Sequence, residues 1–443
     1  MAGFSRRGLL SVSAALCALC APALAADGYF LIGYGARQKA LGGAGVADSR
    51  DAMSLSINPA GLVDLERQMQ LGMTALLIDR GYSTTGQPHV VAPGDVRSGR
   101  PLFPIPNNAF SAPIDADSAW GTASYANGGI NTSYDFGHYR PPHGGPYGGG
   151  FAGVDLEQMF TTVGYARKFG ALSIGVAPTL AVQMLNVQGL KNFGPYSASP
   201  DHISDNGYDW SVGGGIRAGL QYRVTEQFRV GVAASTPMYM TSFRKFSGLF
   251  ADGGRFDIPA SIIAGLAYDV TPDLTVMADW RHIFYSGVPA LHNASFPLRF
   301  NSLGSPNSPG FDWQDTNSAS FGVEWRATPA LALRAGYHYA TNPVPSRAVA
   351  FNVLSPVVNA HHVSGGFSYA VTKNSTIDFA AVYAFKNNVS GLEALPQSAQ
   401  NPFGAYNPNA TINLWLRGLE FTIGWTYKFD PGDHSFLPNL QRL

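Results

Sequence analysis

The sequence reads LEFTIGWTYKF from Leu419 to Phe429, and apolar and polar side chains alternate along this stretch. Successive side chains of a β-strand point to opposite faces, so the alternation predicts a strand with one apolar and one polar face. The same period of two recurs in residues 274–281 and 331–339. These stretches therefore predict strands rather than helices.

An aromatic residue precedes a tight turn at regular places along the chain. A repeat of this length is also compatible with a propeller or solenoid, but those folds need connections of similar length. Here short turns alternate with long connections, which is typical of an outer-membrane barrel with an interfacial row of aromatic residues. The aromatic residues are Tyr165, Tyr222, Tyr268, Trp325, Tyr369 and Tyr427, spaced 44 to 58 residues apart. The long connections are residues 83–104, 135–153, 189–206, 243–256, 288–311, 342–359 and 388–413.

The alternating segments number fourteen. An even number returns both chain ends to the periplasmic side, and closing the sheet satisfies the backbone groups that lipid cannot. A soluble sandwich is the alternative, but it would bury its apolar face and would not need aligned aromatic residues. We therefore predict an all-β fold, a fourteen-stranded antiparallel transmembrane β-barrel. The predicted strands are residues 66–80, 105–113, 118–127, 154–168, 171–188, 207–223, 227–242, 257–270, 274–287, 312–327, 331–341, 360–371, 375–387 and 414–429.

The composition is that of a chain in an apolar environment. Of 443 residues only 13% are charged, about half the share in an ordinary soluble domain, and 12% are aromatic. The 29 basic residues balance the 29 acidic ones, so no net charge attracts nucleic acid. We expect a monomer whose partners are hydrophobic small molecules and outer-membrane lipids, with no nucleic acid.

The first 25 residues have the features of a signal peptide for the general secretory route. Arg6 and Arg7 precede an apolar run that is too short to span a bilayer, and residues 23–25 form a cleavage site. Both cysteines, Cys17 and Cys20, fall within this segment. The mature chain therefore has no cysteine, which excludes disulfides, cysteine nucleophiles and cysteine-bound metals. We expect no cofactor and no metal.

The segment that follows lacks alternation and is rich in small residues. Gly42 and Gly43 lead towards Asn58-Pro59-Ala60-Gly61, where proline fixes φ and glycine permits a tight turn. Such a segment would fit inside a barrel in close contact with its walls, and a flexible tail is the alternative. The predicted units are the signal peptide (1–25), an N-terminal hatch that plugs the barrel (26–65), the barrel (66–429) and a C-terminal periplasmic tail (430–443).

Charged residues of both signs occupy the polar faces of the predicted strands. Mixed signs can form ion pairs that anchor a plug, whereas an ion-selective pore favours one sign. Solvated lumen residues with no such role are the alternative. Adjacent strand residues such as His361 and His362 face opposite ways, and no serine accompanies a histidine as in a hydrolase, so we do not expect an enzyme. The candidate lumen charges are Arg217, Asp279, Arg281, Glu324, Arg326 and Arg334.

Several motifs together resemble a known family. Gly42-Gly43-Ala44, Asp51-Ala52 and Asn58-Pro59-Ala60-Gly61 look like the hatch of the FadL-type transporters of long-chain fatty acids and hydrocarbons in Gram-negative outer membranes. The resemblance continues through Asp279-Trp280 and His361-His362-Val363-Ser364 and covers nearly the whole mature chain. It implies a monomeric fourteen-stranded barrel closed by an N-terminal hatch, with these hatch residues holding the plug.

The resemblance also implies a path for the substrate. Hydrophobic molecules would be captured among extracellular loops and would pass to a pocket contacted by the extreme N-terminus, where Tyr29, Phe30 and Leu31 are the matching residues. Tyr29-Phe30-Leu31 replaces an acidic segment of the fatty acid members, so this end of the pocket is expected to be more apolar. A kink in the third strand would open the wall sideways. The matching pair is Gly128 and Gly129, where glycine favours a bulge, and the start of a loop is the alternative.

We therefore expect passive, ligand-gated uptake of hydrophobic molecules across the outer membrane, with long-chain fatty acids as the substrate. One alternative is an aromatic hydrocarbon uptake channel. Another is a general aqueous porin, which a single-channel conductance would distinguish. An outer-membrane lipid-modifying enzyme would need a nucleophile and a base, and an adhesin would lose attachment rather than uptake when its loops are deleted.

Overall fold

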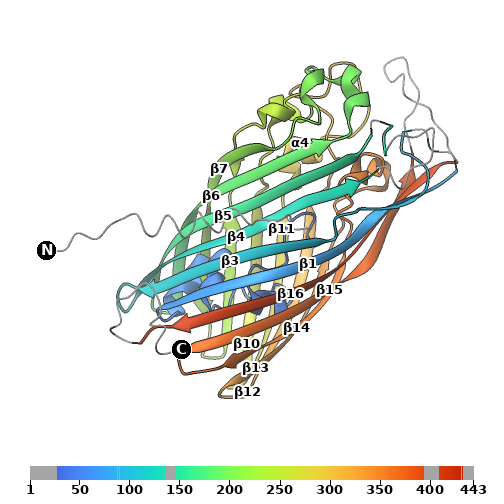
Figure 1. Ribbon diagram of the computed structural model, residues 1–443. Helices are drawn as coiled ribbons and strands as arrows, with labels where there is room; N and C mark the ends of the chain where they lie inside the picture. Colours follow the sequence, from blue (N-terminus) through green and yellow to red (C-terminus); the bar gives the residue numbers. More distant parts are fainter. Residues whose placement is uncertain are drawn as a thin grey trace.

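The structure, a computed structural model, describes residues 27–86, 88, 90–135, 146–148, 150–393, 409–430 and 432. The chain forms a closed antiparallel β-barrel whose long connections gather at one end and whose short turns lie at the other (Figure 1). The predicted signal peptide lies outside the described residues, as does all of the predicted tail except residues 430 and 432. No helix in the described ranges is long and apolar enough to cross a membrane.

Within the described residues, sixteen strand segments form one sheet, and fourteen of them make the barrel wall. The short strands β2 (Asp95–Arg97) and β9 (Tyr239–Met240) only extend the sheet beside β1 and β7. Wall strands that follow one another in the chain pair antiparallel, and β16 pairs with β1 to close the barrel, which confirms the predicted fold class. The wall strands are β1 (Gln68–Thr85), β3 (Leu102–Pro113), β4 (Ser118–Tyr134), β5 (Ala152–Phe169), β6 (Leu172–Gln188), β7 (Asp209–Arg223), β8 (Phe228–Ser235), β10 (Ser261–Thr271), β11 (Leu274–Ile283), β12 (Thr316–Thr328), β13 (Leu331–Ala340), β14 (His361–Ala370), β15 (Ser375–Leu392) and β16 (Thr411–Lys428).

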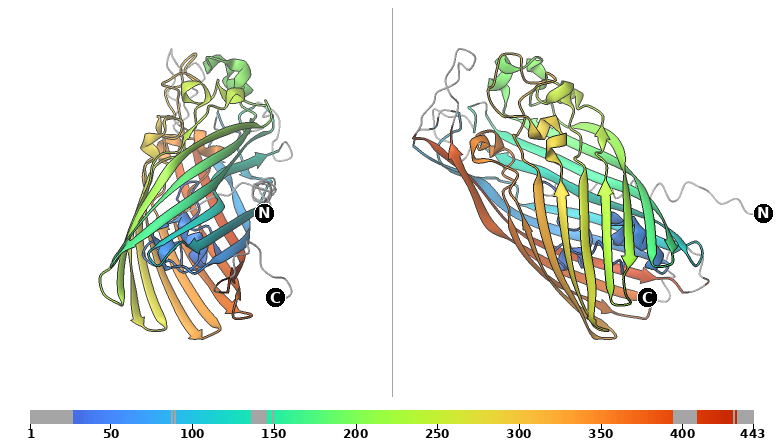
Figure 2. Two further views of the ribbon diagram at one scale, coloured as in Figure 1. Left: turned by 90° about the vertical axis from the view of Figure 1, so that its left-hand side faces the viewer. Right: turned by 180° about the vertical axis from the view of Figure 1, so that it is seen from behind.

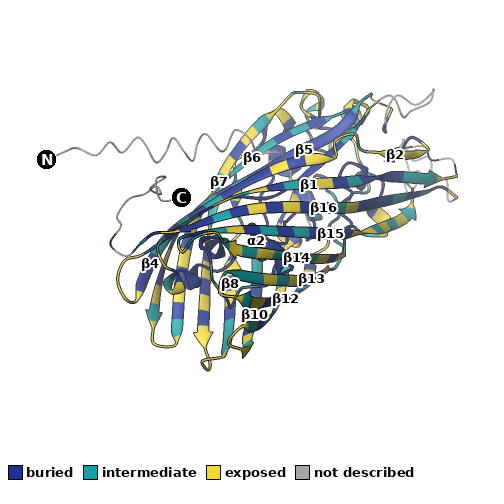
Figure 3. Cartoon of the chain, turned by 60° about the horizontal axis from the view of Figure 1, so that its bottom comes forward, coloured by how far each residue is buried: buried dark blue, intermediate teal, exposed yellow. Residues whose placement is uncertain are grey.

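The alternation along β16 separates the interior of the barrel from its exterior. Thr422 is 1% exposed, whereas the next residue, Ile423, is 62% exposed. Figure 3 shows the same alternation of buried and exposed residues along the neighbouring strands. Apolar side chains therefore face outwards, as they do in a barrel wall that contacts lipid. Of the six aromatic residues before the short turns, five are exposed, and the sixth, Tyr427, packs against Phe429 with ring centroids 5.1 Å apart.

Two strand ends differ from the prediction. β8 ends at Ser235 instead of residue 242, because Pro237 has no N–H to donate to the strand ladder. β4 continues to Tyr134 instead of ending at residue 127. It passes through Gly128 with a β-bulge, so this glycine pair does not begin a loop.

The chain before β1 lies inside the barrel, towards the end with the short turns (Figure 2). We call residues 27–31 the arm and residues 36–65 the hatch. The hatch contains the short helices α2 (Ala36–Ala40), η2 (Ala52–Ser56) and η3 (Pro59–Asp64). The other short helices lie in the connections between strands: η5 (Lys191–Tyr196), η6 (Pro200–His202), η7 (Arg244–Phe246), α3 (Ala251–Gly254), η8 (Tyr285–Gly287), α4 (Pro289–His292), η9 (Ser346–Ala348) and η10 (Phe351–Val353).

Candidate functional site

Ion pairs join the hatch to the barrel wall. Arg37 of α2 lies 2.8 Å from Glu324 of β12 and 2.6 Å from Asp48 of the hatch. Arg334 of β13 and Arg50 of the hatch also contact Glu324, at 2.6 and 2.8 Å. Glu324 is only 3% exposed, so solvent screens these pairs little. The network holds α2 against two neighbouring strands.

The other predicted lumen charges have unequal roles. Asp279 of β11 accepts hydrogen bonds from the backbone N–H groups of Gly45 and Val46, at 2.8 and 2.9 Å. Arg217 of β7 donates to the carbonyl oxygen of Ser56 in the hatch. Arg326, by contrast, is exposed and donates to a carbonyl oxygen of the short turn before β11. The structure therefore brings Asp279 and Arg217 against the hatch and leaves Arg326 outside this contact.

The Asn-Pro-Ala-Gly motif links two parts of the hatch to the wall. Asn58 Oδ1 accepts from the Ala60 N–H at 3.0 Å and so caps η3, which begins at Pro59. Asn58 Nδ2 donates to the carbonyl oxygen of Val46 at 2.8 Å and to that of Leu220 in β7 at 3.1 Å. One amide side chain thus fixes the helix start, the preceding hatch loop and a wall strand together.

The other hatch residues of the predicted motif are buried or closely packed. Gly42 and Gly43 have φ angles of +64° and +87°, in the left-handed region that favours glycine. A Cβ on Gly61 would stand 1.7 Å from a hatch serine oxygen, so no larger residue fits there. Asp51 is buried at the start of η2.

The arm lies against the third wall strand, β4. Tyr29, Phe30 and Leu31 are at most 5% exposed. The N–H of Leu31 donates to the carbonyl oxygen of Asn127 at 3.1 Å, and the N–H of Gly129 donates to that of Tyr29 at 3.1 Å. The structure thus brings the predicted substrate residues and the predicted kink residues into direct backbone contact.

The arm is anchored beside this contact by Asp27. Its carboxylate is fully buried, 3.0 Å from His338 Nε2 and 3.3 Å from Arg281 Nη1, and the Tyr285 hydroxyl donates to its backbone carbonyl. Burial alone would raise the pKa of Asp27, but the charges of His338 and Arg281 and the hydrogen bond to His338 outweigh it and lower that pKa. The carboxylate is therefore ionised at neutral pH. Arg281, a predicted lumen charge, serves the arm rather than the hatch.

The wall has a gap beside the arm. β3 and β4 pair only from Asn107 and Tyr125 down to Pro113 and Ala119. Above that point, β3 residues 102–106 have no ladder partner in β4, among the described residues. The bulge of β4 lies between Ala126 and Gly128, at the lower edge of this gap. A Cβ on Gly128 would stand 1.7 Å from Tyr29 O, so the close approach of the arm requires glycine here.

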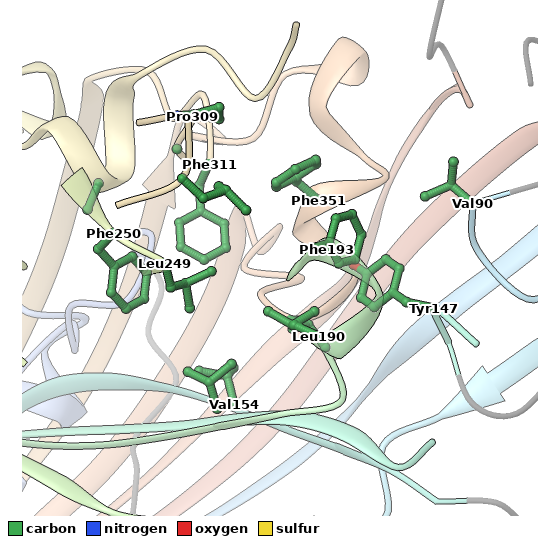
Figure 4. Close-up of a pocket in the computed structure, with 15 residues that line it drawn as sticks. Val90, Tyr147, Val154, Leu190, Phe193, Leu249, Phe250, Pro309, Phe311 and Phe351 are labelled. Carbon is green, nitrogen blue, oxygen red and sulfur yellow. The ribbon is translucent and has the colours of Figure 1, made fainter. Parts of the chain in front are cut away.

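An apolar cavity of about 720 Å³, counting the part open to solvent, lies among the long connections. Figure 4 shows the side chains that surround it, which come from several separate loops and from the upper ends of β5 and β6. None of its lining residues is charged, and the only hydroxyl, that of Tyr147, donates to a backbone carbonyl at 2.8 Å. The lining residues are Val90, Tyr147, Val154, Val187, Leu190, Phe193, Leu249, Phe250, Ala290, Leu303, Pro309, Gly310, Phe311, Phe351 and Leu354.

Aromatic side chains connect this cavity to the arm. The ring of Phe311, in the cavity lining, lies 6.0 Å from that of Trp313, which lies 5.8 Å from Tyr29. Tyr285 packs edge-on against both Trp313, at 5.1 Å, and Tyr29, at 5.8 Å. The sequence analysis did not single out these loop residues. The closely spaced Phe311 and Trp313 in a long connection were the one available signal.

The opposite end of the barrel has a different character. A cavity of about 1430 Å³, counting the part open to solvent, lies below the hatch near the short turns. Its lining includes the charged residues Arg37, Glu324, Arg326, Arg334 and Lys428. An apolar molecule would leave the hydrophobic cavity for a strongly polar one if it crossed the hatch.

Comparisons with known proteins agree with this architecture. A long-chain fatty acid transport protein of Salmonella typhi is 22% identical over 411 residues, which cover 84% of this chain and 88% of that protein. The toluene transporter TodX of Pseudomonas putida is similar in structure with a TM-score of 0.65 and 19% identity, covering 91% of this chain and 100% of that one. A Pseudomonas aeruginosa FadL homologue has a TM-score of 0.66 and 16% identity over 91% and 100% of the two chains. The family of outer membrane protein transport proteins (OMPP1/FadL/TodX) matches residues 20–429, and the chain therefore belongs to this family as an outer-membrane transporter of hydrophobic molecules.

Proposed function

We propose that this protein takes up small neutral hydrophobic molecules, such as monoaromatic hydrocarbons, by passive diffusion along an apolar route. The route begins in the cavity among the long connections, passes Trp313 and Tyr285 to the arm, and leaves through the gap beside Gly128. Apolar burial favours entry of the substrate into the cavity, and a concentration gradient drives its net movement.

The observation that carries this proposal is the uncharged lining of the upper cavity. A carboxylate enters an apolar site at a high cost in free energy unless a positive group or several hydrogen-bond donors meet it. The lining offers neither, and five of its side chains are aromatic: Tyr147, Phe193, Phe250, Phe311 and Phe351. This favours the hydrocarbon alternative over the expected fatty acid. Relatives carry names of both kinds, a long-chain fatty acid transport protein and toluene transporters.

Fatty acids remain the second candidate, because a smaller cavity offers a positive group. It has a volume of about 330 Å³, lies beside Phe30 and is lined in part by Arg217 and Arg281. Arg281 is paired with Asp27, whereas Arg217 donates only to neutral oxygens, including the Tyr125 hydroxyl at 3.0 Å. A substrate carboxylate that reached the arm could bind there.

Uptake of two labelled compounds separates the candidates. Cells that lack their own transporter of this family would be given labelled toluene or labelled oleate, with and without this protein. We expect the protein to speed toluene entry and to leave oleate entry nearly unchanged. Faster oleate entry that disappears in Arg217→Gln would establish the fatty acid candidate instead, and no effect on either compound would contradict both.

A further inference from the structure

Two arginine side chains cross the upper part of the wall gap. Arg80 belongs to β1, and its side chain points inwards on the same face as Leu76 and Ile78. Its Nε donates to the Asn131 carbonyl oxygen of β4 at 2.5 Å, and its Nη2 donates to Asn131 Oδ1 at 2.7 Å. On the other side of the gap, its Nη1 donates to the carbonyl oxygen of Arg100 at 3.0 Å. One guanidinium group therefore ties the two unpaired edges together.

The position of Arg80 is costly and calls for a purpose. Its side chain is completely buried, and it forms no ion pair with any described residue. All of its hydrogen bonds go to neutral oxygens, and its guanidinium group lies 5.3 Å from the ring centre of Phe103. A buried cation without a counter-ion is unfavourable, and in a membrane protein it usually marks a functional position. Here its bonds replace strand pairing that the gap has interrupted.

A second connection crosses the same gap on the outer side. Asp155 of β5 shares the outward face with the exposed residues Val163 and Tyr165. Arg100, which precedes β3, reaches over β4 to Asp155 at 2.5 Å, and the Tyr208 hydroxyl donates to the same carboxylate oxygen at 2.8 Å. Arg80 inside and Arg100 outside thus span the gap at one level.

Below this level the gap is spanned by no ladder and by no side-chain ion pair among the described residues. Its lower edge is the Asn107–Tyr125 pair, and the arm occupies the space between at Gly128. Above it, the Gly99 N–H donates to the Ser133 carbonyl at 2.7 Å. The two arginine contacts therefore form the upper border of the unpaired section.

We propose that Arg80 and Arg100 set the upper size limit of the molecules that leave through the wall, as positioning residues that hold the two edges of the gap together. The inference rests on the proposed lateral exit, because without such an exit the width of the gap would not affect transport. Arg80 provides the permanent border. The Arg100–Asp155 pair is the part that a substitution can release without unfolding the wall, since Arg100 is 44% exposed.

The test compares initial uptake rates of a one-ring and a four-ring neutral hydrocarbon, toluene and pyrene. In Arg100→Gln and in Asp155→Asn we expect the pyrene-to-toluene ratio to rise roughly two- to fivefold, which matches the strength of a partly exposed ion pair. The double variant should show no further rise, because both changes break the same contact. The charge exchange Arg100→Asp with Asp155→Arg should return the ratio towards that of the unchanged protein.

Arg97 supplies a matched control. It is an exposed arginine of the neighbouring strand β2, and it lies 3.7 Å from Asp79 of β1, so its ion pair does not cross the gap. Arg97→Gln should leave the pyrene-to-toluene ratio unchanged. An equal rise in Arg97→Gln would show that loss of surface charge, rather than the crossing contact, changes the ratio, and it would overturn the proposal.

A reversible cross-link tests the same point from the other direction. The mature chain has no cysteine of its own if cleavage follows residue 25, so Arg100→Cys with Asp155→Cys can be joined selectively by a short bis-methanethiosulfonate linker. We expect the free double variant to admit pyrene, the linked form to exclude it, and reductant to restore its entry, while toluene entry stays constant. An unchanged ratio throughout would overturn the size limit and leave the uptake function standing. Absence of toluene uptake in the unchanged protein would instead contradict the proposed function itself.

Discussion

The hatch and the arm are consecutive parts of one segment inside one barrel, yet different forces hold them. The hatch is bound by buried charges, among them the contacts of Glu324 with Arg37 and Arg334. The arm is bound by aromatic packing, two backbone hydrogen bonds to β4 and one carboxylate, that of Asp27. Buried ion pairs are hard to separate because each partner is left uncompensated. A few backbone bonds and ring contacts can be exchanged for contacts with a hydrophobic ligand.

This difference suggests a division of labour. The hatch closes the lumen permanently, and the polar cavity beneath it offers no favourable site to an apolar molecule. The arm lies where the aromatic route meets the wall gap, so a substrate that displaces Tyr29 from Gly128 also uncovers the gap. We therefore expect changes in the hatch to alter stability and conductance, and changes in the arm to alter uptake.

Glu324→Gln should have the largest effect, on the hatch. The substitution leaves Arg37, Arg50 and Arg334 without their shared carboxylate, and loss of one partner of a buried pair costs about 3–5 kcal/mol. We expect a lower unfolding temperature and transient ion conductance in planar bilayers. Arg326→Gln, at an exposed position, is the control and should change neither. A silent, fully stable Glu324→Gln barrel would contradict the anchoring role of the network.

The next effect concerns the arm. Replacement of Tyr29, Phe30 and Leu31 together by serine removes the buried apolar surface next to Trp313 and Tyr285. We expect toluene uptake to fall about tenfold, equivalent to 1.4 kcal/mol, with normal barrel assembly and no conductance. Assembly is measured by heat-modifiable migration on gels. Uptake at the level of the unchanged protein would show that the arm does not contact the substrate.

A smaller effect is expected at the contact between the arm and the wall. In Gly128→Ala the new Cβ would collide with the Tyr29 carbonyl, so the two backbone hydrogen bonds must break, at about 0.5–1.5 kcal/mol each. Hydrogen exchange of the arm amides should quicken, and uptake should lie between that of the serine variant and that of the unchanged protein. Gly418→Ala is the matched strand control, since the nearest atom to its new Cβ is 3.5 Å away. Equal exchange in both variants would refute the close fit at the bulge.

The strands could be predicted from the sequence because their signal is local. The period of two in Leu419–Phe429 reports directly which side chains of β16 face lipid, and the aromatic residues before the turns mark where hairpins end. The glycine pair at 128–129 was also recognisable as a bulge. Its contact with the arm was not, because residues about a hundred positions apart share no pattern.

The upper cavity could not be predicted for the same reason. Its lining residues come from connections that have no periodicity, and only the closed barrel brings Val90, Leu190 and Phe351 together. The border of the gap is a similar case. Arg80 belongs to an ordinary alternating strand, and its role depends on the absence of pairing between two other strands.

The smallest effect is the pH dependence of arm docking. Because the pKa of Asp27 is lowered in the docked arm, its ionised form stabilises docking at all pH values above the ordinary carboxyl range near 4, and this contribution is lost as the pH falls through the lowered pKa. Asp27 faces His338 and Arg281, so protonation of the carboxylate breaks two ion pairs. Arm amides should therefore remain protected from pH 8 to 5 and lose protection, by about 1 kcal/mol, only in stronger acid. Asp27→Asn should show the reduced protection already at pH 7 and no further loss in acid, and a further loss equal to that of the unchanged protein would assign the titration to another group.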